Sequence, residues 1–406
     1  MEQELEENNK NNNETQIHQQ NEPLISQSQQ QEPAEKPDKA THCVETILKD
    51  ISQYKSTDLS CKIPAEKQHR FSIAPMFDVS NVHFRFFIRL LTRYSTLWTE
   101  MYHATAITDS PKRRALCLRL NHIEHPVCCQ LGGNDPDLLT EAAKHVEKAG
   151  FDEVDINCGC PSSKVKAGAF GACLMKDPER VAKCVKAMQE AVSIPVHVKC
   201  RIGVDEQDSY DFVKKYVEVI SGVGCKHFIV HARKAYLKGL NPAQNRNIPP
   251  LKYDVVVRLK KDFPGLDFTI NGGFKTHGAI EEILKEENGL YGCMVGRLAL
   301  HNPWVLSDID RRVFGLENQR FSRREVLRIY GAYIDDYLKE NPKVKWPTLI
   351  KPIVPLFKGC KSAGVYKRVV SDRARHKGMK VFSELMELAI KEMEEANVEA
   401  LDERPP

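Results

Sequence analysis

The chain has 406 residues, 41% of them hydrophobic, which is enough for one large domain with its own core and a smaller one. Its formal net charge of +4 is unevenly spread, because residues 1–40 carry nine Asp and Glu against three Lys and leave about +10 on the rest. No apolar run approaches twenty residues, so we expect no membrane span, and the basic remainder suits a polyanionic partner.

Residues 1–60 are predicted to form a disordered tail and linker. The first forty residues are rich in Asn and Gln, with tracts at 11–13 and 29–31, and offer little apolar surface to offset the entropy lost on folding. They lack the apolar core of a secretory signal and the Arg-rich, acid-poor character of a transit peptide. We therefore expect a cytoplasmic protein, with the nucleus as the alternative, and a monomer.

The thirteen cysteines are odd in number, scattered, and mostly set in apolar strand-like segments. This pattern favours buried free thiols in a reducing compartment over a disulfide framework. Cys158 and Cys160 form a C-x-C pair, but the sequence has no second Cys pair at zinc-like spacing, so we expect no metal site.

Eight short strand-like segments follow one another from Phe71, each succeeded by a helix-length stretch. Asp135-Pro136 and Asp177-Pro178 are typical helix starts. The segments are 71–74, 97–100, 127–130, 153–156, 196–199, 228–231, 268–271 and 293–296. Eight such units predict an α/β fold, a (β/α)8 TIM barrel over residues 68–316, and a doubly wound sheet is the alternative.

Beyond Gly315 the pattern predicts helices only, at 322–339, around 349–361 and at 379–395, which together form a small all-α domain over residues 320–400. Ser322 and Glu325 have the spacing of a capping box. The domain carries a basic run interleaved with Tyr366, which could stack on a base while the cations bind phosphates; a solvated charged surface is the alternative. The basic positions are Lys358, Lys361, Lys367, Arg368, Arg373, Arg375, His376 and Lys377.

Polar side chains cluster where the predicted strands end, and in a barrel these ends meet at the face that carries the active site. They are Asp78, Glu100, Gln130, Asn157, Cys160, Lys199, Arg201, His231, Arg233, Asn271 and Arg297. Polar loops after apolar strands are the plainer explanation for any one of them.

Cys160 is the candidate acid or nucleophile, because it follows a buried strand in a turn between Gly159 and Pro161. A free thiol has a pKa of about 8.5 and is mainly protonated near neutral pH, so it can donate a proton. An inert buried thiol is the alternative. The following loop, 163–171, carries two lysines and could close over a polyanionic substrate or be merely solvated.

Two glycine turns follow the seventh and eighth strands, where TIM barrels commonly bind phosphate: Asn271-Gly272-Gly273 and Gly296-Arg297. A phosphorylated cofactor held there would place its ring near Gln130, Lys199 and His231. Lys199 could stabilise negative charge on a reduced flavin, form a Schiff base, or make a buried salt bridge.

With these residues assembled, the chain resembles the tRNA-dihydrouridine synthases, and among them the bacterial-type A subfamily, tRNA-dihydrouridine(20/20a) synthase. Nine short stretches carry the resemblance, in order and on the expected strands. They are 74–78, 130–133, 157–162, 170–175, 198–203, 231–235, 245–250, 271–273 and 295–297.

The resemblance implies an FMN-bound barrel that reduces uridine to 5,6-dihydrouridine in the D-loop of tRNA, at positions 20/20a, with NADPH as reductant. Reduced FMN would give hydride to C6 and Cys160 a proton to C5, on a uridine turned out of its stack. The implied tRNA contacts are Asn157, Arg246, Lys367 and Arg368. The implied FMN contacts are Pro75, Met76, Gln130, Lys199, His231, Asn271, Gly272, Gly273, Gly296 and Arg297.

The chain departs from the family pattern at Cys158, where Val is usual, and at Ser80-Asn81, where Thr-Asp is usual. Cys158 could react or pair with Cys160 under oxidation. Two other functions fit the residues: an FMN-dependent barrel oxidoreductase acting on a small molecule such as a dihydropyrimidine or enone, and a non-catalytic tRNA-binding chaperone.

Overall fold

The computed structural model describes residues 69–406, so the predicted tail and linker at 1–60 lie outside the described residues. Eight parallel strands form one sheet in the order β1-β8-β7-β6-β5-β4-β3-β2. The ring closes between β1 and β2, where Ile73 N donates to Thr96 O at 2.9 Å and Thr96 N to Phe71 O at 3.1 Å. The strands are β1 Phe71–Ile73, β2 Leu97–His103, β3 Val127–Gly132, β4 Glu153–Asn157, β5 Val196–Arg201, β6 His227–His231, β7 Asp267–Asn271 and β8 Gly292–Val295.

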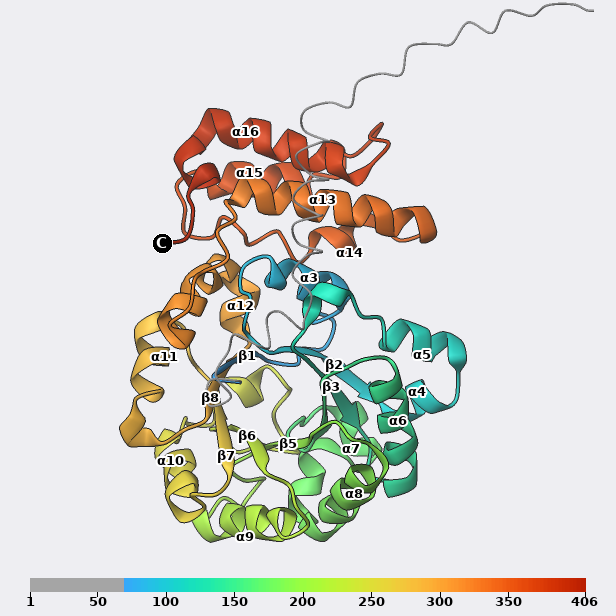
Figure 1. Cartoon of the computed structure of the whole chain (residues 1–406), viewed down its shortest axis with the longest axis vertical. Coiled ribbons are helices and arrows are strands. Elements are labelled where there is room, and N and C mark those ends of the chain that lie inside the picture. Colours follow the sequence, from blue (N-terminus) through green and yellow to red (C-terminus); the bar gives the residue numbers. More distant parts are fainter. Residues whose placement is uncertain (1–68) are drawn as a thin grey trace, which may run out of the picture. The chain divides into compact units, whose positions relative to one another are not determined.

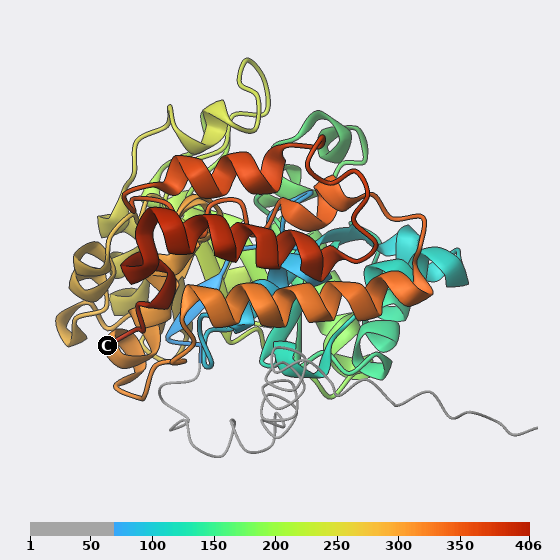
Figure 2. The same ribbon diagram turned by 90° about the horizontal axis from the view of Figure 1, so that it is seen from above.

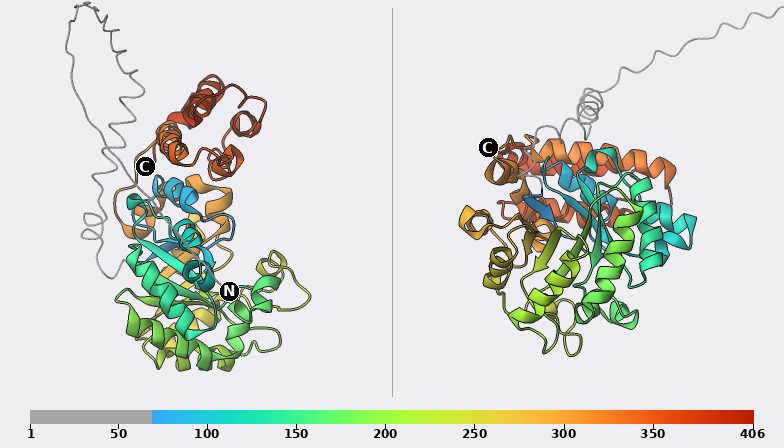
Figure 3. Two further views of the ribbon diagram at one scale, coloured as in Figure 1. Left: turned by 90° about the vertical axis from the view of Figure 1, so that its right-hand side faces the viewer. Right: turned by 60° about the horizontal axis from the view of Figure 1, so that its bottom comes forward.

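Helices surround the ring of strands (Figures 1 and 3), so the predicted (β/α)8 barrel is confirmed. Asp135 and Asp177 cap helices that begin at the following proline, as their spacing predicts. The helices up to residue 301 are α3 Val82–Arg89, α4 Ala104–Thr108, α5 Pro111–Cys117, α6 Pro136–Lys148, α7 Ser163–Ala167, α8 Pro178–Ala191, α9 Tyr210–Ser221, α10 Tyr253–Asp262, α11 His277–Ile283 and α12 Arg297–His301. Short 3-10 segments include η2 His122–Glu124, η3 Gly171–Lys176 and η4 Gln244–Arg246.

The inside of the barrel is layered, because alternate residues of a strand point to the same face. At the amino ends of the strands, Glu153 accepts hydrogen bonds from His69 Nε2 at 2.9 Å and His197 Nε2 at 3.1 Å. Although burial alone would raise the pKa of Glu153, these two histidines hold it well below its usual value. A separate apolar cluster comprises Ala74, Trp98, Cys128, Ile229 and Met294. Further along the same strands, Gln130, Asn157, Lys199, His231 and Asn271 line the cavity described below.

The C-terminal region contains α13 Arg323–Glu340, α14 Trp346–Ile350, α15 Ala363–Ser371 and α16 Phe382–Asp402, which lie alongside one another in Figure 2. The predicted capping box of Ser322 and Glu325 is present. The prediction of a helix around 349–361 is wrong, because residues 351–360 form turns. Pro352 and Pro355 lack the N–H groups that would donate the backbone hydrogen bonds of a helix. Domain boundaries at 68–316 and 320–400 stay predictions. Within residues 69–406, no helix is long and apolar enough to span a membrane.

Helix α3 of the barrel packs on α13. Phe86 and Tyr333 stack with ring centroids 3.7 Å apart, and the Tyr333 hydroxyl lies 3.0 Å from Nδ1 of His83. Burial, reinforced by Arg119 and Arg85, lowers the pKa of His83 to about 4. The imidazole is therefore neutral in the folded protein at neutral pH.

This contact should make the protein lose stability on mild acidification. Between pH 6.5 and 4, His83 is protonated in the unfolded chain but stays neutral in the folded chain. The free energy of unfolding should therefore fall by about 2 kcal/mol when the pH is lowered from 7 to 5. Urea unfolding at several pH values measures this loss. His83→Gln, which cannot titrate, should lose correspondingly less; equal losses in both proteins would contradict the assignment.

Candidate active site

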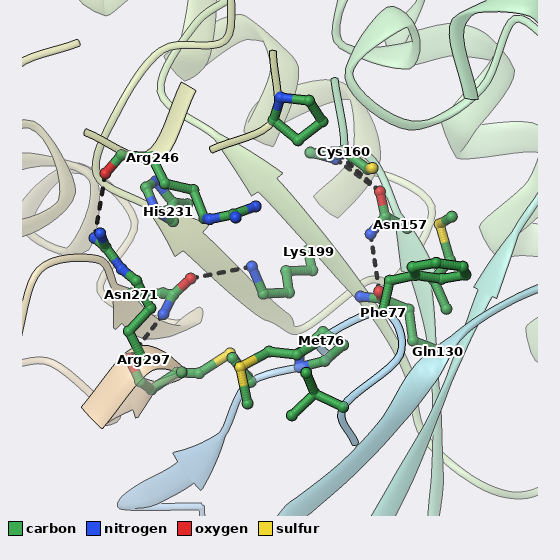
Figure 4. A pocket seen from close by; sticks show the side chains of 18 of the residues that line it. Met76, Phe77, Gln130, Asn157, Cys160, Lys199, His231, Arg246, Asn271 and Arg297 are labelled. Atoms are coloured by element: carbon green, nitrogen blue, oxygen red, sulfur yellow. Dashed lines mark hydrogen bonds between the residues drawn. The ribbon is translucent and has the colours of Figure 1, made fainter. Parts of the chain in front are cut away.

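A cavity of about 1370 Å³ opens at the carboxyl ends of the strands (Figure 4). It brings together thirteen of the fifteen predicted site residues; Lys367 and Arg368 lie elsewhere, exposed on α15. The thirteen are Pro75, Met76, Gln130, Asn157, Cys160, Lys199, His231, Arg246, Asn271, Gly272, Gly273, Gly296 and Arg297.

Asn157, the last residue of β4, holds the turn that carries Cys160. Its Oδ1 accepts hydrogen bonds from the backbone N–H groups of Gly159 at 3.2 Å and Cys160 at 2.9 Å. Its Nδ2 donates to Gln130 Oε1 at 2.8 Å, and Gln130 Nε2 donates to Asp155 Oδ2 at 2.7 Å. A chain of buried amides thus ties the thiol to two neighbouring strands.

The other side of the turn is fixed by Arg201 and by the loop after Cys160. Arg201 Nε donates to Gly159 O at 2.8 Å, and Ala172 N donates to Cys160 O at 2.9 Å. Gly171 has φ +63°, and a Cβ there would lie 2.6 Å from Cys160 O. Arg201 belonged to the predicted polar cluster but not to the predicted site; its place two residues after Lys199 was the available signal.

Cys158 is not a second reactive thiol at the cavity. The residue is fully buried and does not line the cavity. Burial raises the pKa of its thiol well above the usual value. A neutral, inaccessible sulfur is a poor nucleophile, so burial argues against the expected reaction or pairing with Cys160 under oxidation, which stays a prediction.

Lys199 and Asn271 face the middle of the cavity (Figure 4). Lys199 Nζ donates to Asn271 Oδ1 at 3.2 Å, and Asn271 Nδ2 donates to Met294 O at 2.8 Å. Burial lowers the pKa of Lys199 to about 8, while the nearby Asp155 opposes the shift. Among residues 69–406 Lys199 makes no ion pair within 4.0 Å, so the buried salt bridge is not formed and its charge is available to a ligand.

His231 and the two glycine turns fit a phosphorylated cofactor. The His231 Nδ1 atom is buried and has no hydrogen-bond partner, and burial together with Arg201 and Lys199 holds the pKa of the ring well below its usual value. Gly272 and Gly273 have φ of +124° and +83°, a conformation that side chains rarely adopt. The neutral ring can make one more hydrogen bond, and the glycines leave backbone groups open to phosphate oxygens.

The cavity is lined by cations without carboxylates. Among the described residues that line it are Lys199, Arg201, Arg246, Lys275 and Arg297, whereas no Asp or Glu is among them. Such a one-signed lining favours an anionic ligand.

Three of the predicted polar strand ends do not line the cavity: Asp78, Glu100 and Arg233. Glu100 accepts a hydrogen bond from Asp78 N, and Arg233 donates to Pro249 O, so these side chains fix loops instead.

In the loop at 163–171, Lys166 donates to Leu237 O and so ties this loop to the next one, and closure of the loop over a substrate stays a prediction. One expectation about a basic segment needs correction. Tyr366 is fully buried and its hydroxyl donates to Ile353 O at 3.0 Å, so its predicted stacking on a base is wrong. Its neighbours Lys367 and Arg368 are exposed.

A protein-family model described as "Dihydrouridine synthase (Dus)" matches residues 72–394. The chain belongs to the dihydrouridine synthase family.

Three relatives of this family member carry the name tRNA-dihydrouridine(20/20a) synthase. The Synechocystis sp. protein is 44% identical over 301 residues, 74% of this chain and 88% of its own length. The Salmonella typhimurium protein is 44% identical over 323 residues, 79% of this chain and 94% of its own. The Escherichia coli K12 protein is 44% identical over 310 residues, which are 76% of this chain and 88% of its own length. The similarity therefore covers nearly the whole of each relative.

Gly171→Ala should disturb the Cys160 turn. The added methyl group meets Val165 and the Cys160 carbonyl and sits on a left-handed residue, so the free energy of unfolding should fall by more than about 1 kcal/mol. Cys160 should be alkylated faster, as followed by mass spectrometry of its peptide. Gly278→Ala is the matched control, because nothing lies within 4 Å of its Cβ. Unchanged stability and alkylation in Gly171→Ala would contradict the assigned contact.

Proposed function

We propose that this chain reduces uridine to 5,6-dihydrouridine in the D-loop of tRNA, at positions 20/20a, with FMN as cofactor and NADPH as reductant. The observation that carries the proposal is a half-buried thiol, Cys160, held in a tied turn at the edge of a large cavity lined by cations. Membership of the dihydrouridine synthase family and the names of its relatives support the same substrate. We further propose a monomer in the cytoplasm or nucleus, where tRNA matures.

The residues present fit FMN, and each has an assigned task. The Gly272 and Gly273 turn would bind the phosphate, and Arg297 would add charge-assisted hydrogen bonds. Lys199 would stabilise negative charge on the cofactor, and His231 would offer its unpaired nitrogen. The other contacts are Pro75, Met76, Gln130, Asn271 and Gly296. Bound FMN supplies the hydride that C6 of uracil receives.

Cys160 donates the proton that C5 of the uracil requires. Hydride at C6 and a proton at C5 together saturate the C5–C6 double bond, and the thiolate left behind regains its proton from water. Asn157 and Arg201 position the sulfur through the turn that they hold. A uridine stacked within tRNA cannot reach this cavity, so it must be flipped out.

Four residues are assigned to tRNA: Asn157, Arg246, Lys367 and Arg368. Arg246 is exposed at the cavity, where it can meet a backbone phosphate as the uridine enters. Lys367 and Arg368 are exposed on α15 and suit phosphates further away. The buried side chain of Asn157 is hydrogen-bonded to the Cys160 turn and to Gln130. A contact of Asn157 with tRNA would therefore be made in addition to these hydrogen bonds.

Cys160→Ala should abolish dihydrouridine formation while leaving bound FMN and tRNA in place, because it removes the proton donor only. Purified protein should be yellow, and dihydrouridine in tRNA can be measured by mass spectrometry after incubation with NADPH. Cys117→Ala on α5, away from the cavity, serves as the control.

Three outcomes would count against this proposal. Full activity of Cys160→Ala would favour a non-catalytic tRNA chaperone. Unchanged D-loop dihydrouridine in cells lacking the protein, together with a yellow protein that reduces only small enones, would favour the small-molecule oxidoreductase. A colourless protein would argue against both enzymes.

Arg297→Met should lower the FMN content per chain at least severalfold, because a charge-assisted contact to phosphate is lost. Flavin absorbance against protein concentration measures it. Arg320→Met removes a surface arginine away from the cavity and should leave the content unchanged. Equal flavin content in the two variants would remove Arg297 from the phosphate site.

A further inference from the structure

Phe77 is the most exposed large hydrophobic side chain in residues 69–406, at 82% of its full accessibility, and yet it lines the cavity. It lies in the loop between β1 and α3. In Figure 4 its ring is on the side of Gln130 and Asn157, across the cavity from Arg297. At this exposure most of the apolar surface of the ring is open to solvent at the rim of the site.

The turn that carries Phe77 is closed by its own hydrogen bonds. Met76 O accepts from Ser80 N at 2.9 Å, and Ser80 Oγ accepts from Met76 N at 2.8 Å. Asp78 has φ +58°, which fixes the direction of the chain directly after Phe77. The turn therefore holds the ring at the rim and does not let it fold into the core.

Two further anchors come from other parts of the fold. Glu100 on β2 accepts a hydrogen bond from Asp78 N. Lys351, directly after α14, donates to Asp78 O at 2.6 Å and to Asp78 Oδ2 at 2.5 Å. The turn is thus tied to the barrel on one side and to the C-terminal helices on the other, which is more support than a merely solvated loop needs.

The surroundings of Phe77 identify the chemistry of its partner. An apolar peptide would leave Arg246 and Lys275, two lining cations that have no task in FMN binding, without an anionic partner, and a lipid would offer no ring to stack on Phe77. Single-stranded nucleic acid combines the two features required, since its phosphates meet cations while its bases stack on aromatic rings. The position of Phe77 at the rim, not in the depth, suits a base beside the reacting uridine.

We propose that Phe77 stacks on a nucleobase of the tRNA D-loop next to the uridine that enters the cavity. This inference rests on the proposed function. The stack replaces part of the base stacking that the flipped uridine gives up, and it sets the register of the loop over the cavity. Phe77 thereby selects which D-loop uridine is presented, through a contact with its neighbour.

Phe77→Leu and Phe77→Trp test the stack. Leu keeps an apolar side chain without a ring, whereas Trp keeps the ring. We expect Phe77→Leu to raise the KM for tRNA and the dissociation constant of tRNA about tenfold, with FMN content and the KM for NADPH unchanged, and Phe77→Trp to behave like the wild type. Leu116→Ala, an exposed apolar change on α5 away from the cavity, is the control.

The remaining outcomes overturn the inference. Unchanged tRNA binding in Phe77→Leu means that no base covers the ring, and equal loss in Leu and Trp variants means that shape alone matters. Lower FMN content or a raised KM for NADPH means that cofactor or reductant covers it. A wild-type protein that forms no dihydrouridine defeats the proposed function instead, and tRNA affinity, measured by filter binding without turnover, still decides the stack.

Discussion

The candidate site depends on the side-chain amide of Asn157. This one group accepts from two consecutive backbone N–H groups of the Cys160 turn and donates to Gln130, which in turn donates to the buried Asp155. Without it, the turn would carry two unsatisfied donors, and only Arg201 and the loop after Cys160 would hold it. Asp155 supplies the far end of the chain of amides, and burial raises the pKa of its carboxyl well above the usual value.

Strand register turns this local contact into a site. Gln130 pairs with Asp155, Asn157 with Lys199, and His231 with Asn271 across neighbouring parallel strands. Because every second residue faces inward, these partners point into the same space and reach the same height. A shift of one residue in any strand would turn its polar side chain outward among the helices.

Much of this was predictable, since the apolar strands, the helix starts at Asp135 and Asp177 and the glycine turns are signals local in the sequence. The turns at 351–360 were also marked, by Pro352 and Pro355, but the apolar residues around them suggested a helix. What sequence could not predict was which polar groups satisfy one another. The burial of Tyr366, the burial of Cys158 and the carbonyl partners of Arg201 all depend on contacts between residues far apart in the chain.

The burial of the Arg201 guanidinium beside the cavity costs free energy. The residue is buried, no carboxylate lies within ion-pair distance of it among residues 69–406, and its partners are the carbonyls of Gly159, Lys234 and Asn245. Burial lowers its pKa to about 10, and a buried guanidinium held only by carbonyls costs free energy that a carboxylate would offset. Such a carboxylate, however, would cancel the field that draws phosphates toward Cys160. The anionic substrate itself can supply the missing charge, so part of the cost is returned only when it binds.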